Sequence, residues 1–399
     1  MTERLSLSAL SAPLAGRFPG AGEIDRGLLL VILTLACLGI VMMASASVAI
    51  GEASSDAATH FLQRQATFLA LGTLIFGACL ATPLAWVAAA GSPLLVLSFA
   101  LLVAVLIPGV GNEVNGATRW IPLGPVNVQV SEFVRLFLII YFAALLARQG
   151  ERVRTSAAPM LPVVLVMVTV GGLLLAQPDF GAFAVLGATV AGVLFVAGVP
   201  LMVWLGMGAV GGLGGLGLIL SEPYRLERLT AFTDPWADPF ASGFQLTQSL
   251  IAVGRGEWLG VGLGNSVQKL FYLPEAHTDF VFAVLAEELG VVGMAVTIGL
   301  YSFVVLRGCG VGAASLRRGR LFGGLLAYGV AIGFGLQAFV NMGVNLGLLP
   351  TKGLTLPLMS YGGSSLVVTS LALGLLMRAD LECRRDGRSA SQRPRRRPT

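Results

Sequence analysis

The chain has 399 residues, of which 55% are hydrophobic and only 12% are charged. Because a soluble globular domain carries about 25% charged residues, this composition excludes a soluble protein and predicts an integral membrane protein. The four cysteines form no CxxC pair and no cluster with histidine, which argues against a zinc site. The formal net charge of +5 fits membrane topology rather than nucleic-acid binding, because of where the arginines lie.

Apolar segments long enough to cross a bilayer recur along the whole chain. A helix needs about 20 consecutive apolar residues to cross the hydrocarbon core. Spans are expected near 27–49, 63–83, 92–108, 131–148, 159–176, 181–198, 201–220, 279–306, 319–345 and 358–378. The sequence therefore predicts an all-α polytopic membrane protein with about ten transmembrane helices, and its 52 glycines suit close helix packing in lipid.

Arginine and lysine indicate the orientation of these spans. They gather before the first span, between the fourth and fifth, between the eighth and ninth, and after the last. With ten spans these places share one side, which the positive-inside rule makes cytoplasmic, together with both termini. We expect a cytoplasmic segment at 1–26, a transmembrane domain at 27–378, and a basic, disordered cytoplasmic tail at 379–399 that touches anionic lipid.

Two loops on the outward side are long. The first, 109–130, contains Arg119, and the second, 221–278, is one large outward-facing loop between the seventh and eighth spans. Loops of more than about 15 residues are usually functional or disordered. Short apolar stretches in the second loop predict an amphipathic segment that lies on the membrane or dips into it.

The segment 272–290, which reads YLPEAHTDFVFAVLAEELG, is the most informative part of the chain. It places His277, Asp279, Glu287 and Glu288 at the start of the eighth predicted span. An ionisable side chain inside a bilayer costs roughly 2.5–3.5 kcal/mol on insertion scales, so a chain carries one where a pathway or a reaction needs it. We therefore expect the active site here.

Asp279 allows two interpretations. An Asp in the first turn of a helix complements the helix dipole, so Asp279 could be a capping residue. It could also be a general base in a partly buried site that faces the outer leaflet. Glu287 follows eight residues later, within about 80° of the same helix face, which favours the second interpretation.

Other polar residues also allow either a structural or a functional role. Glu287 and Glu288 could be buried structural acids, and His277 could relay a proton or be an ordinary loop residue. Asp179, in the short turn QPDFG, suits turn formation and helix capping. The supporting residues of a site around Asp279 would be His277, Glu275, Glu132, Glu287, Glu288 and Asp179.

Cations in the outward loops indicate an anion site. Lys269, Arg225, Arg228 and Lys352 could each be solvated surface, but few basic residues lie on this side. The segment 360–365, SYGGSS, opens the last span with glycines and hydroxyls. Free N–H groups at such a helix N-terminus suit a phosphate, although the glycines could equally permit a close packing corner.

Several motifs together resemble those of one family, the SEDS membrane proteins of shape, elongation, division and sporulation. They occur in family order over about residues 25–380, and PTKGLTLPL is most similar to the members that act in cell division. The motifs are GATRWIPLG (116–124), QVSEF (129–133), QPDFG (177–181), YRLERL (224–229), LPEAHTDF (273–280), AEELG (286–290) and NMGVNLGLLPTKGLTLPLMSYGGSS (341–365).

The chain departs from the family pattern at a few positions. Val130 and Arg135 stand where the family usually has Pro and Lys. Phe244 replaces a common Tyr, and Phe271 replaces a usual Pro. None of these changes removes a candidate catalytic group, but Arg in place of Lys can change how an anion is held.

The resemblance implies a peptidoglycan glycosyltransferase that polymerises lipid II into glycan strands during septal cell-wall synthesis. Asp279 would be the general base of an inverting transfer, because one displacement needs one base. Cations would stabilise the departing pyrophosphate, and a divalent cation (Mg or Mn) could assist them. The implied substrate- and pyrophosphate-binding candidates are Arg119, Lys269, Arg225, Lys352, Ser360, Gly362, Gly363 and Ser364.

The resemblance also implies a multi-pass protein of the bacterial inner membrane, located at the division septum, with its active site facing the periplasm. The implied partners are lipid II, a cognate class B penicillin-binding protein of the FtsI type, divisome regulators of the FtsQ, FtsL, FtsB and FtsN type, and membrane lipids. Two alternatives stay open, a lipid II flippase and a non-catalytic scaffold for the transpeptidase. A flippase needs polar groups along a path through the bilayer, and here only Glu287 and Glu288 reach beyond the outward half.

Overall fold

The computed structural model describes residues 23–53, 60–114, 117–124, 126–220, 223–270 and 272–391. Helices form most of this part of the chain. The long helices are α1 (Arg26–Ala53), α2 (His60–Ala81), α4 (Gly91–Leu106), α5 (Val130–Gln149), α7 (Met160–Ala176), α8 (Phe180–Ala197), α9 (Leu201–Leu220), α12 (Val281–Arg317), α13 (Leu321–Asn345) and α14 (Gly363–Ser391). The short helices are α3 (Leu84–Ala89), α6 (Arg152–Thr155), α10 (Pro223–Thr233) and α11 (Phe244–Arg255).

The fold is that of an all-α polytopic membrane protein, and each predicted span coincides with one long helix. Within the described residues, seven helices are long and apolar enough to cross a membrane, namely α1, α2, α5, α8, α9, α12 and α13. Helices α4 and α7 are apolar but shorter, and α14 combines an apolar first half with a charged second half. The total of ten spans therefore stays a prediction.

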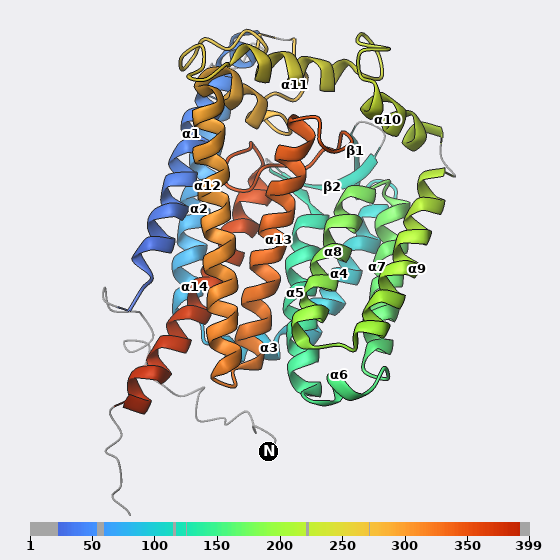
Figure 1. Ribbon diagram of the computed structural model, residues 1–399, viewed down its shortest axis with the longest axis vertical. Helices are drawn as coiled ribbons and strands as arrows, with labels where there is room; N and C mark the ends of the chain where they lie inside the picture. Colours follow the sequence, from blue (N-terminus) through green and yellow to red (C-terminus); the bar gives the residue numbers. More distant parts are fainter. Residues whose placement is uncertain are drawn as a thin grey trace, which may run out of the picture.

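The helices stand side by side in an upright bundle (Figure 1). Buried positions make up 72% of the span in α5 and 67% in α13 but none in α9, so α5 and α13 form the centre and α9 lies at the edge. Helices α10 and α11 and the strands lie at one end of the bundle, here called the loop end. Helix α1 begins and α14 finishes at the opposite end, here called the termini end.

A small antiparallel sheet lies at the loop end, where we expected only a loop over 109–130. Its strands are β1 (Asn112–Val114), β2 (Ala117–Leu123) and β3 (Val126–Gln129), in the order β1-β2-β3. Trp120 on β2 pairs with Gln129 on β3, directly before α5. Strands this short carry too few residues for a clear alternating pattern, so the sequence did not reveal them.

The large loop at 221–278 is partly helical. Helix α10 contacts α9, and α11 packs on α12 and α13. The packed face of α11 buries Leu246 and Ala252, while Ile251 is exposed. Two short helices of this loop therefore lie across the loop end of the bundle (Figure 1).

The C-terminal tail differs from its expected disorder over 379–399. Helix α14 continues to its end at Ser391, and Arg384 forms an ion pair with Asp25 at 2.8 Å. This pair ties α14 to the start of α1 and explains why the helix persists beyond its apolar part. Residues 392–399, and residues 1–22 of the predicted N-terminal segment, lie outside the described residues.

Helix α12 was expected as one continuous span from 279 but is broken at Gly290. Gly290 has φ 63° and ψ −163°, a conformation that side chains rarely adopt. The loop before it passes so close that a Cβ on Gly290 would lie 2.5 Å from the amide nitrogen of Gly260. The amide of Val261 donates to the carbonyl of Glu287 at 3.0 Å, which replaces a helical bond lost at the break. Residues 281–289 therefore form a separate half-helix.

A buried cluster of charges fixes this half-helix. Glu287 and Glu288 are both fully buried. Arg255 pairs with Glu287 at 3.2 Å, and Lys269 pairs with Glu288 at 2.9 Å. Lys269 Nζ also donates to Ser45 Oγ on α1 at 2.8 Å. Two acids and two bases balance in charge, so the cluster ties α1, α11 and the following loop to α12 without a net buried charge.

Replacing Lys269 by Met would leave Glu288 buried without its counter-charge. We expect this variant to lose roughly 3–5 kcal/mol of stability, the usual cost of breaking a buried ion pair. The thermal unfolding midpoint of the purified protein measures the loss. The double variant Lys269→Met/Glu288→Gln removes both charges and should recover most of it, and a single variant as stable as the wild type would contradict the assignment.

Candidate active site

A tight turn holds Asp279 directly before α12. The carbonyl of Glu275 accepts hydrogen bonds from the amides of Thr278, Asp279 and Phe280 at 3.1 to 3.2 Å. Glu275 has φ 56°, which is uncommon for a residue other than glycine and is often found at functional sites. Thr278 Oγ1 donates to Glu275 Oε2 at 2.6 Å and closes the turn from the side-chain end.

Two asparagines on α13 hold the backbone of Asp279. Asn341 Nδ2 and Asn345 Nδ2 donate to the carbonyl of Asp279 at 2.8 Å and 3.0 Å. Asn345 Oδ1 also accepts a hydrogen bond from the amide of Ala283 at 2.9 Å and so satisfies the first turn of α12. The two residues are four apart and therefore share one face of α13. The central helix of the bundle thus positions the candidate base.

The segment 351–355 approaches Asp279 from the other side. Gln337, one turn before Asn341 on α13, donates to the carbonyl of Thr355 at 3.0 Å. This contact brings Gly353 so close to Asp279 that a Cβ on Gly353 would lie 2.9 Å from Asp279 Oδ2. Glycine is therefore needed at this position to leave room for the carboxylate.

The electrostatic surroundings of Asp279 favour a base that works near neutral pH. The side chain is half-buried, and within the described residues its carboxylate accepts no hydrogen bond. The pKa of Asp279 is raised to about 7, mainly by burial and also by the nearby Glu275 carboxylate, while the cations Arg119 and Arg228 act in the opposite direction. The usual pKa of an Asp is about 3.9, so this carboxyl titrates in an unusual range.

Arg119 joins the sheet to the turn between α7 and α8. Its Nε donates to the carbonyl of Gln177 at 3.4 Å, and its Nη1 lies 3.9 Å from Asp179 Oδ1. Asp179 accepts a hydrogen bond from the amide of Ala182 at 3.2 Å, so it caps α8. The expected capping role of Asp179 is confirmed, and Asp179 also orients Arg119 towards the site.

Two further cations of the outward loops lie around the 351–355 segment. Arg228 on α10 donates to the carbonyl of Thr351 at 3.4 Å. Lys352 Nζ lies 4.8 Å above the centre of the Phe180 ring, and its Cδ would be 3.6 Å from a Cβ on Gly181. Lys352 therefore lies over the N-terminus of α8, where positive charge from the helix dipole adds to its own.

His277 lies on the side of the turn that faces α2 and α14. Its ring centre is 5.4 Å from that of Phe61 and 5.8 Å from that of Tyr361. Its Nδ1 is buried and has no partner among the described residues. Burial lowers the pKa of His277, partly offset by Glu275, so the ring is neutral at pH 7. No contact links this ring to the Asp279 carboxylate, so a proton relay stays a prediction.

Three of the predicted residues lie elsewhere. Lys269, Glu287 and Glu288 belong to the buried charge cluster, and the hydrogen-bonding groups of Lys269 are occupied by Ser45, Glu288 and a backbone carbonyl. Lys269 therefore does not supply the expected free cation for pyrophosphate. The sequence could not distinguish these roles, because the partners are remote in the chain.

The 360–365 segment is a packing corner rather than an open phosphate cradle. Ser360 Oγ accepts a hydrogen bond from the amide of Leu356, and Ser364 Oγ accepts one from the amide of Gln129. The Phe68 ring lies against Gly363, with its Cζ 2.5 Å from where a Cβ would be. The two hydroxyls are therefore occupied, although the segment borders the turn that holds Asp279, since the amide of Tyr361 donates to the carbonyl of His277 at 2.9 Å. The side chain of Arg225 lies outside the described residues.

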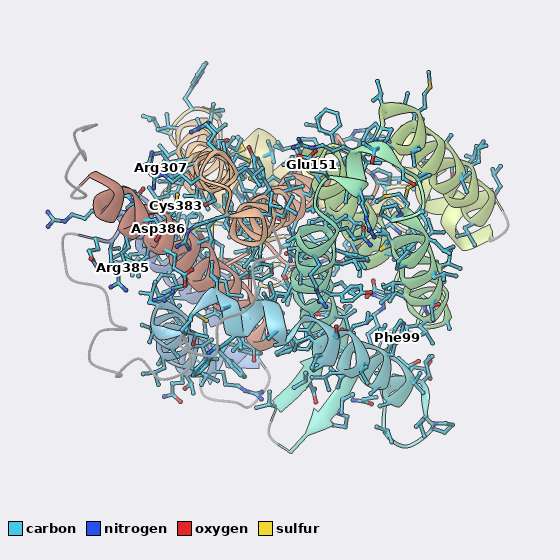
Figure 2. All side chains as sticks on the ribbon, turned by 90° about the horizontal axis from the view of Figure 1, so that it is seen from below. Phe99, Glu151, Arg307, Cys383, Arg385 and Asp386 are labelled. Atoms are coloured by element: carbon cyan, nitrogen blue, oxygen red, sulfur yellow. The ribbon has the colours of Figure 1, made fainter. Side chains whose placement is uncertain are left out.

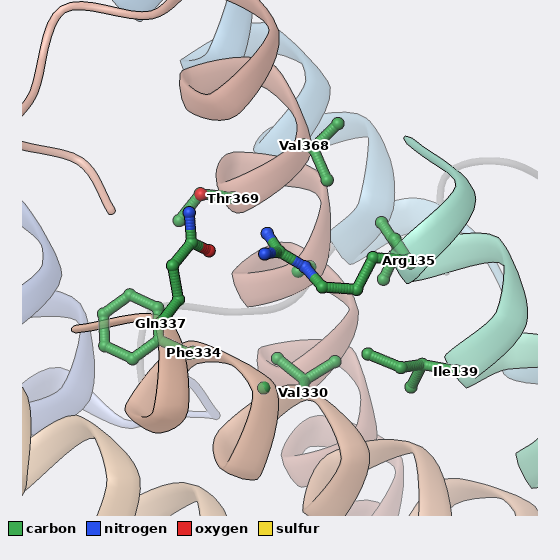
Figure 3. A pocket seen from close by; sticks show the side chains of 10 residues that line it. Arg135, Ile139, Val330, Phe334, Gln337, Val368 and Thr369 are labelled. Atoms are coloured by element: carbon green, nitrogen blue, oxygen red, sulfur yellow. The ribbon is translucent and has the colours of Figure 1, made fainter. Parts of the chain in front are cut away.

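Glu132 lies behind the site and is paired. Arg135 Nη2 is 2.5 Å from Glu132 Oε2, and Gln337 Nε2 lies 3.4 Å from Glu132 Oε1. Arg135, Gln337 and Thr369 line a small cavity between α5, α13 and α14, into which the first two side chains point (Figure 3). Through Gln337 this pair is connected to the 351–355 segment, so Glu132 supports the site from a distance.

Sequence reasoning missed the amides that build the site. Gln337, Asn341 and Asn345 recur every four residues in an otherwise apolar span, and this spacing was the available signal. The described residues contain no group of three His, Cys, Asp or Glu side chains able to hold a metal ion. The site therefore combines the Asp279 carboxyl, the nearby Glu275, a neutral amide support and the cations Arg119 and Arg228.

The sequence relatives cover nearly the whole chain. Residues 26–385 match the family described as "Cell cycle protein". A probable peptidoglycan glycosyltransferase FtsW of Alkalilimnicola ehrlichii is 56% identical over 382 residues, covering 94% of this chain and 94% of that protein. A protein of the same description from Halorhodospira halophila is 50% identical over 391 residues, covering 97% and 99%.

Solved structures of the same architecture also match this chain. The Rod shape determining protein RodA of Thermus thermophilus is 31% identical with a TM-score of 0.67, covering 90% of this chain and 96% of that one. A chain of a peptidoglycan synthase complex, solved to explain the coordination of polymerization and crosslinking, is 33% identical with a TM-score of 0.74, covering 90% and 98%. The chain therefore belongs to the cell cycle protein family, the SEDS proteins that include FtsW and RodA.

Proposed function

We propose that the chain is a peptidoglycan glycosyltransferase that polymerises lipid II into glycan strands. Relatives that align over nearly its full length are named for this activity. We further propose that it lies in the bacterial inner membrane, with the loop end facing the periplasm, and works at the division septum. The arginines at the termini end and the similarity to FtsW relatives support this orientation and place.

The state of Asp279 carries the proposal. The carboxyl is half-buried, its pKa is raised to about 7 by burial and by Glu275, and the cations Arg119 and Arg228 lie near it. Two asparagines and a tight turn hold its backbone, so the carboxylate is fixed although no donor occupies it. A base poised near the working pH and beside cations suits a reaction that removes a proton while an anion leaves.

The transfer inverts configuration, because the donor sugar is alpha-linked to undecaprenyl pyrophosphate and the product is the beta-1,4 glycan. One displacement with one base is therefore sufficient. Asp279 accepts the proton of the acceptor GlcNAc 4-hydroxyl while that oxygen forms a bond to C1 of the donor MurNAc. The bond between C1 and the pyrophosphate oxygen breaks, and pyrophosphate leaves with the electron pair.

Cations of the chain stabilise the leaving pyrophosphate in this proposal. Arg119 from the sheet and Arg228 from α10 lie near enough to lower the pKa of Asp279, and Lys352 adjoins Gly353, which contacts its carboxylate. Within the described residues no three metal-binding side chains converge, so a divalent cation here would depend on the pyrophosphate for part of its ligands. The proposed mechanism therefore assigns the charge of the leaving group to arginine and lysine.

The buried charge cluster removes the main argument for a flippase. Glu287 and Glu288 were the ionisable groups that reached beyond the outward half, and both are neutralised by Arg255 and Lys269. Both glutamates are fully buried and paired, so they offer no free polar groups along a path for a headgroup. The polymerase is therefore the better-supported function.

The proposed partner is a class B penicillin-binding protein of the FtsI type that crosslinks the new strand. The structure similar to this chain that concerns both polymerization and crosslinking supports a paired synthase. For a division protein, regulators of the FtsQ, FtsL, FtsB and FtsN type complete the proposed assembly.

Asp279→Asn tests the proposed base. The change keeps the shape of the side chain, and only the backbone of Asp279 bonds to α13, so the fold should be retained. We expect polymerisation of purified lipid II, with the cognate transpeptidase co-purified, to fall by at least about 10²-fold. Equal product from both proteins at equal complex yield would remove Asp279 from the mechanism.

The pH dependence tests the environment of Asp279. Because the base must be deprotonated, the rate should rise with pH and level off above a pKa of about 7. Glu275→Gln removes a negative charge that raises this pKa, so the rise should move to lower pH. Arg228→Gln removes an opposing cation and should move it to higher pH. Identical profiles for all three proteins would show that another group controls the rate.

Gly353→Ala tests the close contact at the carboxylate. The added Cβ would lie 2.9 Å from Asp279 Oδ2 and must displace it. A displacement of about 1 Å can lower a rate by about 10²-fold, so we expect a loss of that order in polymerisation with an unchanged unfolding midpoint. Gly254→Ala, on α11, meets no atom within 4 Å and is the matched control. Equal activities of the two variants would contradict the geometry.

A further inference from the structure

A second cavity lies at the termini end of the bundle, far along the chain from the residues around Asp279. Its volume is about 170 Å³, and it is formed where α5, α8, α12 and α13 come together beside α6. Leu146, Val196, Leu316 and Leu325 form apolar walls. The cavity is much larger than the roughly 10–15 Å³ that one water needs, and its apolar walls suit hydrocarbon rather than water.

The polar groups of this cavity lie on one short segment. Glu151 and Arg154 are its charged lining residues, and both are exposed. Arg152 and Arg148 are exposed on the same segment, which gives it a net positive charge. The Arg154 side chain extends across the end of α8, since its Nε would be 3.1 Å from a Cβ on Gly198. One cation therefore lies at the mouth of an apolar space.

Several other arginines at the termini end form ion pairs. Arg384 pairs with Asp25, and Arg320 pairs with Glu382. Within the described residues, Arg152 and Arg154 have no carboxylate partner. Viewed from this end, Glu151 lies well apart from the paired cluster around Arg385 and Asp386 (Figure 2). Glu151 offsets one of the three arginine charges of this segment, so the segment keeps a net positive charge beside the cavity.

We propose that this cavity binds one anionic phospholipid of the leaflet at the termini end. The phosphate would lie beside Arg154 and Arg152, and part of an acyl chain would enter the apolar space between α8 and α13. In the membrane orientation proposed above, on which this inference rests, the helix ends that form the cavity reach the headgroup region of that leaflet. Basic pockets between transmembrane helices on this side are a recognised binding mode for anionic headgroups. The bound phospholipid would link the short connection between α5 and α7 to α8 and α13.

Titration with a short-chain phosphatidylglycerol tests the proposal. The full-length protein in detergent is titrated, and the bound lipid is counted by native mass spectrometry. Phosphatidylcholine of the same chain length and free glycerol phosphate are titrated in parallel. We expect tighter binding of phosphatidylglycerol than of either, because the site needs both a net negative headgroup and a chain. Equal binding of the two lipids, or saturable binding of glycerol phosphate alone, would overturn it.

Two variants locate the binding. Arg154→Gln should weaken phosphatidylglycerol binding about fivefold, the effect expected of one cation near an anionic headgroup. Ala197→Leu should weaken it by filling the cavity while keeping every charge. Arg26→Gln removes the same charge from an exposed position at the start of α1 and should bind like the wild type. Wild-type affinity in Arg154→Gln, or an equal loss in Arg26→Gln, would refute this site, whether or not Ala197→Leu folds.

Discussion

A helix that breaks inside a membrane must find partners for its backbone within the protein, because lipid offers none. Helix α12 breaks at Gly290, and the first half-helix, 281–289, therefore needs hydrogen-bond partners from the protein at both ends. At its start Asn345 accepts the amide of Ala283, and at its end the amide of Val261 reaches the carbonyl of Glu287. Because the backbone groups at both ends are hydrogen-bonded, the turn before the half-helix is held in one place, and the candidate base is held with it.

Acids that lie close together in the sequence differ in whether a cation forms an ion pair with them. Glu287 and Glu288 are fully buried but balanced by Arg255 and Lys269, so they hold structure together. Asp279 is less buried, yet its carboxylate lacks a hydrogen-bond donor and its pKa rises to about 7. The difference arises from the surroundings, since carboxyl groups in different environments can be given different roles.

The two ends of the bundle use arginine differently. At the loop end, Arg119 and Arg228 face an acid that they do not neutralise directly, which leaves positive potential for an anionic substrate. At the termini end, several arginines form ion pairs that join α1, α12, α13 and α14, whereas within the described residues Arg152 and Arg154 beside α6 have no such pair. Positive charge therefore has two structural settings in this protein, near a carboxylate without a direct ion pair at the loop end and within ion pairs between helices at the termini end.

The sequence alone determined the class of fold, because apolar segments of spanning length can be satisfied only by helices in a membrane. It also indicated Asp279 as the candidate base and the likeness to the SEDS family, because both depend on local motifs. Tertiary structure decided which polar residues work together. Lys269 and the 360–365 segment were expected to bind an anion, but contacts with Glu288, Phe68 and Gln129 occupy them. Only the tertiary structure shows that the amide side chains of α13 hold the turn of Asp279, because hydrogen bonds between residues about 60 apart in the chain leave no local pattern.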